Sequence, residues 1–196
     1  MMSVNLEQIQ HYFTLDEYFG LLENSDQRYE YRDGEIVCMS GGSEAHGLIG
    51  SNIQAELNLQ LTRKKCRVFS SDQAIKAPPL DPFCFPDVSV TCAQREYTKV
   101  RGISVLLNPI LLIEVASPEG DDYDYRDKRV AYLNIPSLCE YLIVDQEKPR
   151  MTHYVKADDD VWQHFKYTDM NTIAELKSIE CRLSLSDIYR DVVFKE

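Results

Sequence analysis

The chain has 196 residues, 44% of them hydrophobic, which is enough for the core of one globular domain spanning residues 1–196. Its formal net charge of −11 argues against a protein that binds DNA nonspecifically through charge alone. There is no run of about 18 apolar residues and no basic region leading into an apolar stretch at the N-terminus, so we expect no membrane anchor and no signal peptide.

The cysteines are scattered along the chain and none forms a CxxC pair. Several lie in apolar, strand-like contexts. We therefore expect buried free thiols in a cytoplasmic protein, and no zinc site. The six cysteines are Cys38, Cys66, Cys84, Cys92, Cys139 and Cys181.

The N-terminal part predicts a short helix and a hairpin. Thr14 and Glu17 have the spacing of a capping box, which opens a helix that we expect to run through Leu22. The segment 28–40, RYEYRDGEIVCMS, predicts a β-hairpin with an Asp-Gly turn at residues 33–34.

A long amphipathic helix is predicted over residues 43–65, with Ser43 as its N-cap. The dense basic run TRKKCR, residues 62–67, lies at its end, and we interpret it as a solvated helix end that the helix dipole favours. The apolar positions that define the helix are Ala45, Leu48, Ile49, Ile53, Leu57 and Leu61.

The middle of the chain alternates predicted strands and loops. Residues 66–77 and 87–92 are strand-like, whereas 78–86 and 93–109 are predicted to be loops. The stretch 110–116, ILLIEVA, is almost continuously apolar, which is typical of a central strand covered on both faces.

The last third predicts a helix over 124–134, a strand over 139–145 and an antiparallel hairpin from 151–157 and 161–167. A short capped helix and an extended segment are expected over 183–194. Strands outnumber helices, but the helices interleave with them. The predicted fold class is therefore α/β or α+β, built around a mixed sheet.

Two acidic residues lie in or at the start of predicted strands, which is an unusual position for surface carboxylates. Asp87 begins a strand, and Glu114 lies inside an apolar strand, where it shares a face with Leu112 and Ala116. A carboxylate is costly to bury unless it is paired or binds a metal. Pairing with an arginine or with backbone amides would explain each acid, and two converging carboxylates would equally suit a hard cation such as Mg²⁺.

Pro86-Asp87 followed by a glutamate in an apolar strand resembles the signature of the PD-(D/E)XK nuclease superfamily, although Ala116 stands where its lysine is usual. Residues 114–145 are similar to a bacterial restriction endonuclease family of that superfamily, whose nuclease activity is inferred from its fold. The matching residues are Glu114, Ser117, Pro118, Asp124, Lys128, Tyr132, Glu140 and Tyr141, and segments 12–22, 28–49, 85–90 and 181–194 match as well. The resemblance implies a mixed sheet flanked by helices.

The resemblance also implies that the catalytic lysine comes from the helix after the glutamate strand. Asp124, Lys128 and Tyr132 recur every four residues, so they lie along one face of the predicted helix. Such a helix, returning over the sheet, would bring Lys128 towards Glu114, and the small Ala116 would leave room for it. A surface lysine paired with Asp124 remains the alternative.

Two more residues come with the resemblance. Glu30 lies where the family is usually acidic and would add a carboxylate to the site, or else form a cross-strand pair with a basic residue. His46 matches a common family histidine, which would contact the scissile phosphate or orient a carboxylate, or else fill a polar gap at the start of its helix.

Together these residues imply a metal-dependent endonuclease that hydrolyses DNA. Asp87 and Glu114, helped by the Val115 carbonyl, would bind Mg²⁺ (or Mn²⁺), and Lys128 would orient water or stabilise charge. DNA and a second copy of the chain, as a homodimer, are the expected partners. The alternatives are an inactive nuclease fold that binds nucleic acid or protein, and a hydrolase of a small phosphorylated substrate.

Overall fold

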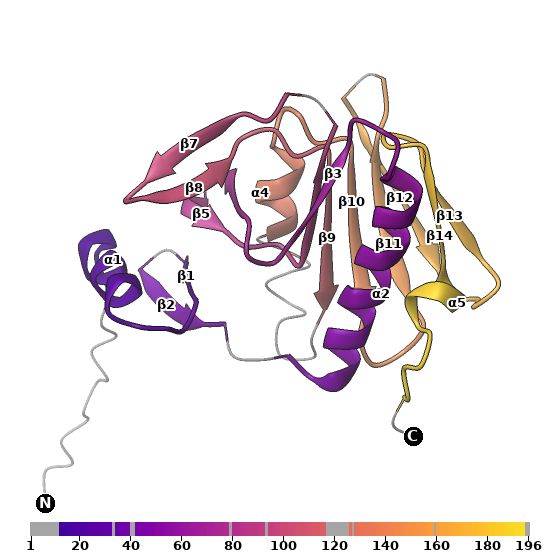
Figure 1. The fold of residues 1–196 in the computed structure, drawn as a ribbon, viewed down its shortest axis with the longest axis horizontal. Helices are drawn as coiled ribbons and strands as arrows, with labels where there is room; N and C mark the ends of the chain where they lie inside the picture. Colours follow the sequence, from indigo (N-terminus) through magenta and orange to yellow (C-terminus); the bar gives the residue numbers. More distant parts are fainter. Residues whose placement is uncertain are drawn as a thin grey trace, which may run out of the picture.

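The computed structural model describes residues 12–32, 34–39, 42–78, 80–92, 94–116, 126, 128–158 and 160–194. Its centre is a six-stranded mixed sheet (Figure 1) in which β9 and β10 are parallel and every other neighbouring pair is antiparallel. In spatial order the strands are β12 (Trp162–Tyr167), β11 (Met151–Lys156), β10 (Glu140–Asp145), β9 (Leu111–Ala116), β6 (Val88–Thr91) and β3 (Arg67–Ser70). The predicted mixed sheet is confirmed.

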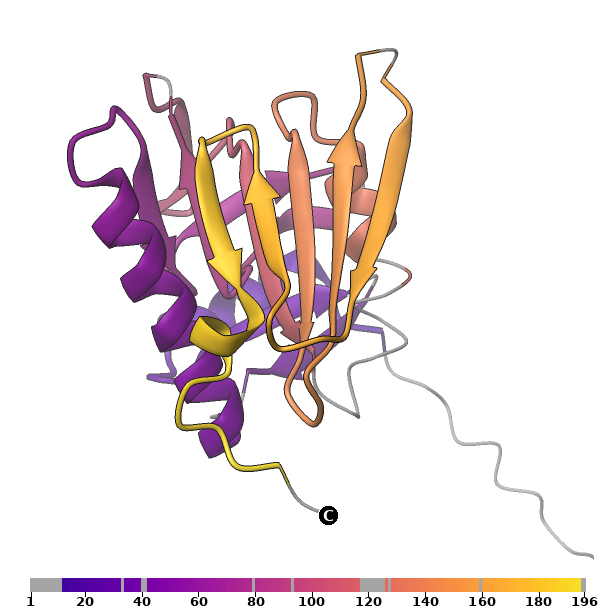
Figure 2. The same cartoon turned by 90° about the vertical axis from the view of Figure 1, so that its right-hand side faces the viewer.

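One face of this sheet is covered by α2 (Glu44–Leu61) and by the C-terminal part of the chain. The Ser43 side chain accepts a hydrogen bond from the His46 amide and caps α2, as predicted. The C-terminal part comprises β13 (Ile173–Leu176), β14 (Cys181–Ser184) and α5 (Leu185–Ile188). Figure 2 shows α2 and the β13–β14 hairpin on the near side of the sheet, with α4 behind it. The core beneath them includes Ile49, Ile53, Leu57, Leu61, Leu111, Ile113 and Val115.

The opposite face carries α4 (Arg129–Leu133) and a second sheet. That sheet has the order β5 (Leu80–Cys84), β4 (Ala74–Ala77), β8 (Ile103–Leu106) and β7 (Tyr97–Val100). Beside it lie α1 (Leu15–Glu23) and the hairpin of β1 (Tyr29–Arg32) and β2 (Glu35–Cys38), which bring the N-terminal part of the chain to this side of the molecule (Figure 1).

The two N-terminal predictions are confirmed. Thr14 and Glu17 form a reciprocal capping box at the start of α1. At the hairpin turn Gly34 has φ +92°, a conformation that side chains with a Cβ rarely adopt. A Cβ at this position would also lie 2.7 Å from the Tyr12 ring, so the turn requires glycine for two reasons.

Both predicted loops are wrong in part, because segment 78–86 contains β5 and segment 93–109 contains the β7–β8 hairpin. Three of the four β7 residues are exposed, so the strand has no alternation of apolar and polar residues for sequence analysis to detect. The segment 66–77 is likewise two strands in two different sheets, joined by a turn at residues 71–73. The hairpin of β13 and β14 was not predicted. β5 and β8 both pair with β4, whereas β13 and β14 pair with each other as a separate two-stranded sheet.

The predicted C-terminal elements from β10 to α5 are otherwise present, with Ser184 as the cap of α5. Of the helix predicted over 124–134, the second half is present as α4. None of the helices in the described part of the chain has the length and apolar character needed to cross a membrane.

The expectation of free thiols is wrong for Cys66 and Cys92, which form a disulfide. They flank the antiparallel pair Arg67–Thr91, so they lie opposite each other across β3 and β6 although they are 26 residues apart in sequence. A cross-strand relation of this kind depends on strand register, which cysteine spacing does not reveal. Cys38, Cys84, Cys139 and Cys181 are free, and of these Cys84 and Cys181 are buried.

Candidate active site

Asp87 and Glu114 lie on neighbouring strands of the central sheet. β6 pairs with β9 so that Val88 is opposite Ile113. The same antiparallel register, continued by one residue, places Asp87 opposite Glu114, and opposite residues project from the same face. The two acids that stood out in the sequence are therefore neighbours across the sheet.

Asp87 is held by groups from two elements. Its Oδ2 accepts a hydrogen bond from the Val115 amide at 2.7 Å. It also lies 3.3 Å from Nε2 of His46, which the first turn of α2 brings to the beginning of β6. Burial opposes ionisation of Asp87, but the contacts with His46 and the Val115 amide outweigh it and lower the pKa of the carboxyl. Asp87 is therefore ionised at neutral pH.

Glu114 is only 3% exposed, and two groups donate to its Oε1. The Lys128 Nζ lies 3.1 Å away and the Tyr132 hydroxyl 2.7 Å away. Lys128 immediately precedes α4 and Tyr132 lies within it. This helix covers the sheet face from which Glu114 projects. A buried carboxylate with a cationic and a neutral donor is stabilised in its charged form.

Lys128 immediately precedes α4 and is 4% exposed, so it is not a surface lysine. Its Nζ lies between two carboxylates, 3.1 Å from Glu114 and 3.3 Å from Glu30. The expected approach of Lys128 to Glu114 is therefore present. The alternative partner, Asp124, lies outside the described residues.

Glu30 reaches the site from the N-terminal hairpin. Its Oε1 accepts a hydrogen bond from the Phe85 amide at 3.2 Å, and its Oε2 lies 3.0 Å from Nη2 of Arg32. Burial opposes ionisation, but the charges of Lys128 and Arg32 outweigh it and lower the pKa of Glu30. The alternative, a cross-strand pair with a basic residue, is wrong, because Val37 lies opposite Glu30 and Arg32 is on the same strand.

Two residues of the site had no role assigned from sequence. Tyr132 was noted only as a family match, yet its hydroxyl contacts Glu114, and burial raises its pKa so that it remains a proton donor. The sequence did contain a signal for Tyr132: it follows Lys128 by four residues, which places both side chains on one face of a helix. Arg32 had a similar signal, because it follows Glu30 by two residues on the same strand face.

The acids suit a hard cation. Asp87 and Glu114 offer carboxylate oxygens from adjacent strands, and Val115 offers a carbonyl next to them. Among the residues that the structure describes, no three His, Cys, Asp or Glu side chains gather as a metal cluster by themselves. Mg²⁺ characteristically binds one or two carboxylates and keeps several waters, so the donor set fits this ion better than zinc.

A cavity of about 450 Å³ opens beside Asp87. Its walls are the first half of α2, including His46, Gly47 and Gly50, and Ser71 from the turn between β3 and β4. Asp87 is thus accessible from outside, whereas Glu114, Glu30 and Lys128 lie deeper. Of the four residues, Asp87 therefore lines the open hollow, and the buried group of Glu114, Glu30 and Lys128 does not.

Comparison with known proteins agrees with this architecture. A crystal structure from Anabaena variabilis ATCC 29413, described as a "putative nuclease belonging to DUF820", superposes with a TM-score of 0.73 over 92% of this chain and 99% of that chain. Its sequence identity is 19%, so the likeness concerns the fold.

Two uncharacterized proteins of Synechocystis sp. are similar in sequence. One, slr1290, is 32% identical and covers 91% of this chain and 92% of its own. The other, sll1609, is 31% identical and covers 76% of this chain and 84% of its own. The model of the family Uma2, "Putative restriction endonuclease", matches residues 15–186. With this match over most of its length, and a nuclease-like fold around the paired acids, the chain belongs to the Uma2 restriction endonuclease family.

Proposed function

We propose that this protein is a metal-dependent endonuclease that hydrolyses phosphodiester bonds in DNA. The observation that carries the proposal is the Lys128 ammonium, buried between Glu114 and Glu30 at 3.1 and 3.3 Å, on the sheet face where Asp87 lies opposite Glu114. A lysine desolvated beside acids is costly in a protein interior and is characteristic of functional sites. Membership of a restriction endonuclease family supports the nuclease class.

Asp87 and Glu114, with the Val115 carbonyl, would hold Mg²⁺ (or Mn²⁺). When bound, such an ion lowers the pKa of a coordinated water and neutralises phosphate charge. In this assignment the Val115 amide and His46 orient the Asp87 carboxylate, since both contact its Oδ2.

Lys128 has the second role in the proposal. Its ammonium would orient the attacking water and stabilise negative charge that develops on the phosphate. Glu30 and Tyr132 are positioning residues, because Glu30 contacts Lys128 and Tyr132 contacts Glu114. Arg32 also contacts Glu30, at 3.0 Å, so Glu30 is shared between two cations.

The test is incubation of supercoiled plasmid with the full chain and Mg²⁺, beside the variants Asp87→Ala and Lys128→Ala. We expect nicking or linearisation by the wild type, abolished in both variants and by EDTA. Lys148→Ala, which removes an exposed lysine, serves as the control and should cut at the wild-type rate. Undiminished cleavage by Asp87→Ala would refute the assignment. Binding of DNA without cleavage by the wild type would instead support an inactive nuclease fold.

The cavity beside Asp87 favours a second candidate, a hydrolase of a small phosphorylated substrate. Its volume of about 450 Å³ lies in the range of small-molecule sites, about 300–1,000 Å³. Phosphate release from nucleoside monophosphates by the wild type, without plasmid cleavage, would favour this candidate. Plasmid cleavage that nucleoside monophosphates do not inhibit would exclude it.

A further inference from the structure

A cluster of basic side chains lies at the end of the central sheet that is remote from Asp87. Arg63 and Lys65 lie between α2 and β3, Arg67 begins β3, and Arg95 follows β6. All four are exposed. Such a concentration is unexpected in a chain with a formal net charge of −11. We call these four residues the basic cluster.

The basic cluster has no acidic partner among the described residues, whereas Lys64 in the same run has one. Lys64 Nζ donates to the carbonyls of Ile179 and Glu180 and lies 3.4 Å from the Glu180 carboxylate, so it ties α2 to the β13–β14 hairpin. Arg67 instead donates from Nη1 to the carbonyls of Lys64 and Cys66, at 3.1 and 2.6 Å. These bonds orient its guanidinium group but leave its charge unneutralised.

The basic cluster surrounds a hollow with the chemistry of an anion site. A cavity of about 190 Å³ is lined by Lys65, Arg67, Thr91, Gln94 and Arg95. Three of these residues are cations, and Gln94 carries an amide group that can donate hydrogen bonds. The Thr91 hydroxyl already donates to the Asn108 carbonyl at 2.9 Å. Among the residues that the structure describes, no carboxylate lines the hollow. This set disfavours a metal ion and suits the oxygens of a phosphate group.

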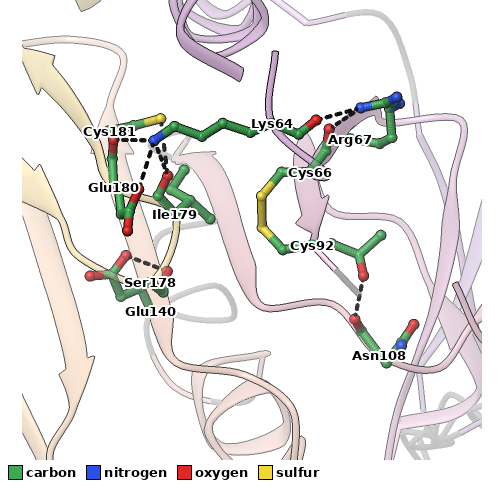
Figure 3. Close-up of a disulfide and its surroundings, with 11 residues drawn as sticks. Lys64, Cys66, Arg67, Cys92, Asn108, Glu140, Ser178, Ile179, Glu180 and Cys181 are labelled. Carbon is green, nitrogen blue, oxygen red and sulfur yellow. Dashed lines mark hydrogen bonds and ion pairs between the residues drawn. A yellow bond between two sulfur atoms is a disulfide. The ribbon is translucent and has the colours of Figure 1, made fainter. Parts of the chain in front are cut away.

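The two walls of the hollow are covalently joined. Figure 3 shows the disulfide between Cys66 and Cys92, with Arg67 hydrogen-bonded to the carbonyls beside it. Cys66 separates Lys65 from Arg67, and Cys92 lies shortly before Gln94 and Arg95. The crosslink therefore holds the cations of both walls close together despite their mutual repulsion, which is a reason for a disulfide at this place.

Strand β6 connects the hollow to the candidate active site. It leads from Asp87 to Thr91, and Arg67 lies opposite Thr91 on the edge strand β3. Four strand residues span about 14 Å. Along a duplex whose axis runs parallel to β6, successive base pairs rise by about 3.4 Å, so this distance corresponds to about four base pairs of axial rise.

We propose that the hollow of Lys65, Arg67 and Arg95 binds a backbone phosphate of the nucleic acid substrate, about four nucleotides from the bond that is cleaved beside Asp87. This inference rests on the proposed nuclease function. It adds the position of the nucleic acid substrate on the protein surface. It makes the acidic chain a nuclease that holds DNA through a local cationic site rather than through its overall charge.

The experiment compares two triple variants with the same loss of charge. One combines Lys65→Ser, Arg67→Ser and Arg95→Ser; the control combines Lys148→Ser, Lys166→Ser and Lys177→Ser, which are exposed residues elsewhere. Affinity for a labelled DNA duplex is measured by fluorescence anisotropy in EDTA over a series of salt concentrations. EDTA prevents cleavage, so binding is measured independently of catalysis. Circular dichroism and thermal melting establish that both variants fold.

We expect the hollow variant to bind at least about 10-fold more weakly, with a salt dependence reduced by about one unit for each lost phosphate contact. In cleavage assays its KM should rise while kcat changes little. Duplexes with fewer than about four nucleotides beyond the cleavage position should bind the wild type and the variant equally. Equal weakening in both triple variants, or in neither, would overturn the inference.

Inorganic phosphate tests whether the hollow binds a free phosphate ion or a backbone phosphate of DNA. If phosphate raises the melting temperature of the wild type but not of the hollow variant, and duplex affinity is the same for both, the hollow binds a free anion and the proposed DNA contact is wrong. If the wild type does not cleave DNA but binds it through the hollow, the nuclease function fails while the binding site stands. A wild type that binds no nucleic acid refutes both.

Discussion

Among single residues, Lys128 carries the largest electrostatic consequence in the fold. An ammonium group that is 4% exposed is tolerated because Glu114 and Glu30 both lie within 3.3 Å of it. The two acids in turn depend on it, and Glu30 has Arg32 as a second cation. The charges of Lys128, Glu114 and Glu30 therefore stabilise the folded state only together. Removal of one of them leaves a buried charge without its partner.

This interdependence predicts that Lys128→Met destabilises the protein by about 3–5 kcal/mol, because the buried Glu114 carboxylate loses its cation and Glu30 keeps only Arg32. Adding Glu114→Gln to Lys128→Met should recover part of the loss, since one of the uncompensated charges is then removed. Urea unfolding of the two single variants and the double variant gives the coupling energy. Strict additivity of the two changes would show that Lys128 and Glu114 do not interact in solution.

At the scale of elements, α2 links the core to the candidate site. Its buried apolar side chains pack against the sheet, while its first turn carries His46 to Asp87. Ser43 caps this turn and also donates to the side chain of Gln146, which follows β10. The position of His46 thus depends on the N-terminal cap of a helix whose other residues serve the core.

Ser43→Ala should therefore lower the free energy of unfolding by about 0.5–2 kcal/mol, the usual effect of losing an N-cap. It should also lower cleavage activity, because the first turn no longer holds His46 in place. Ser51→Ala in the middle of the same helix is the control and should change stability by less than about 0.5 kcal/mol. Thermal melting and plasmid cleavage measure the two effects, and an unchanged melting temperature in Ser43→Ala would contradict the capping role.

Considered as a whole, the molecule separates acidic and basic side chains along one strand. The carboxylates gather at the beginning of β6, and the basic cluster lies at its end, where the disulfide joins β6 to the edge strand β3. A chain with a net charge of −11 therefore has a carboxylate-rich end and a cation-rich end on the same sheet. The disulfide also closes a large loop of the chain, which includes the whole β4–β5 hairpin.

Reduction of this disulfide should lower the free energy of unfolding by about 3–4 kcal/mol, the chain-entropy value for a loop of this length. Guanidinium unfolding with and without a thiol-free reductant measures the effect. Combined Cys66→Ser and Cys92→Ser should reproduce the reduced protein, whereas Cys38→Ser should behave as the wild type. A midpoint that does not respond to the reductant would mean that the crosslink does not form in solution.

The sequence by itself determined the elements whose signals are local. The capping box of α1, the apolar spacing of α2, and the continuous apolar runs of β9 and β10 depend on neighbouring residues, and these elements are found as predicted. Asp87, Glu114 and Lys128 could be selected in the same way, because a charge in an apolar strand and a family motif are properties of short segments.

Only the tertiary structure decided which of these residues meet. Glu30 and Lys128 are 98 positions apart and contact each other because the N-terminal hairpin packs against β5, and the Phe85 amide just after β5 donates to Glu30. The β7–β8 hairpin, the Cys66–Cys92 bond and the approach of His46 to Asp87 have the same origin. Their stability comes from strand register and from burial of distant segments against one another, neither of which leaves a periodic signal in the segments themselves.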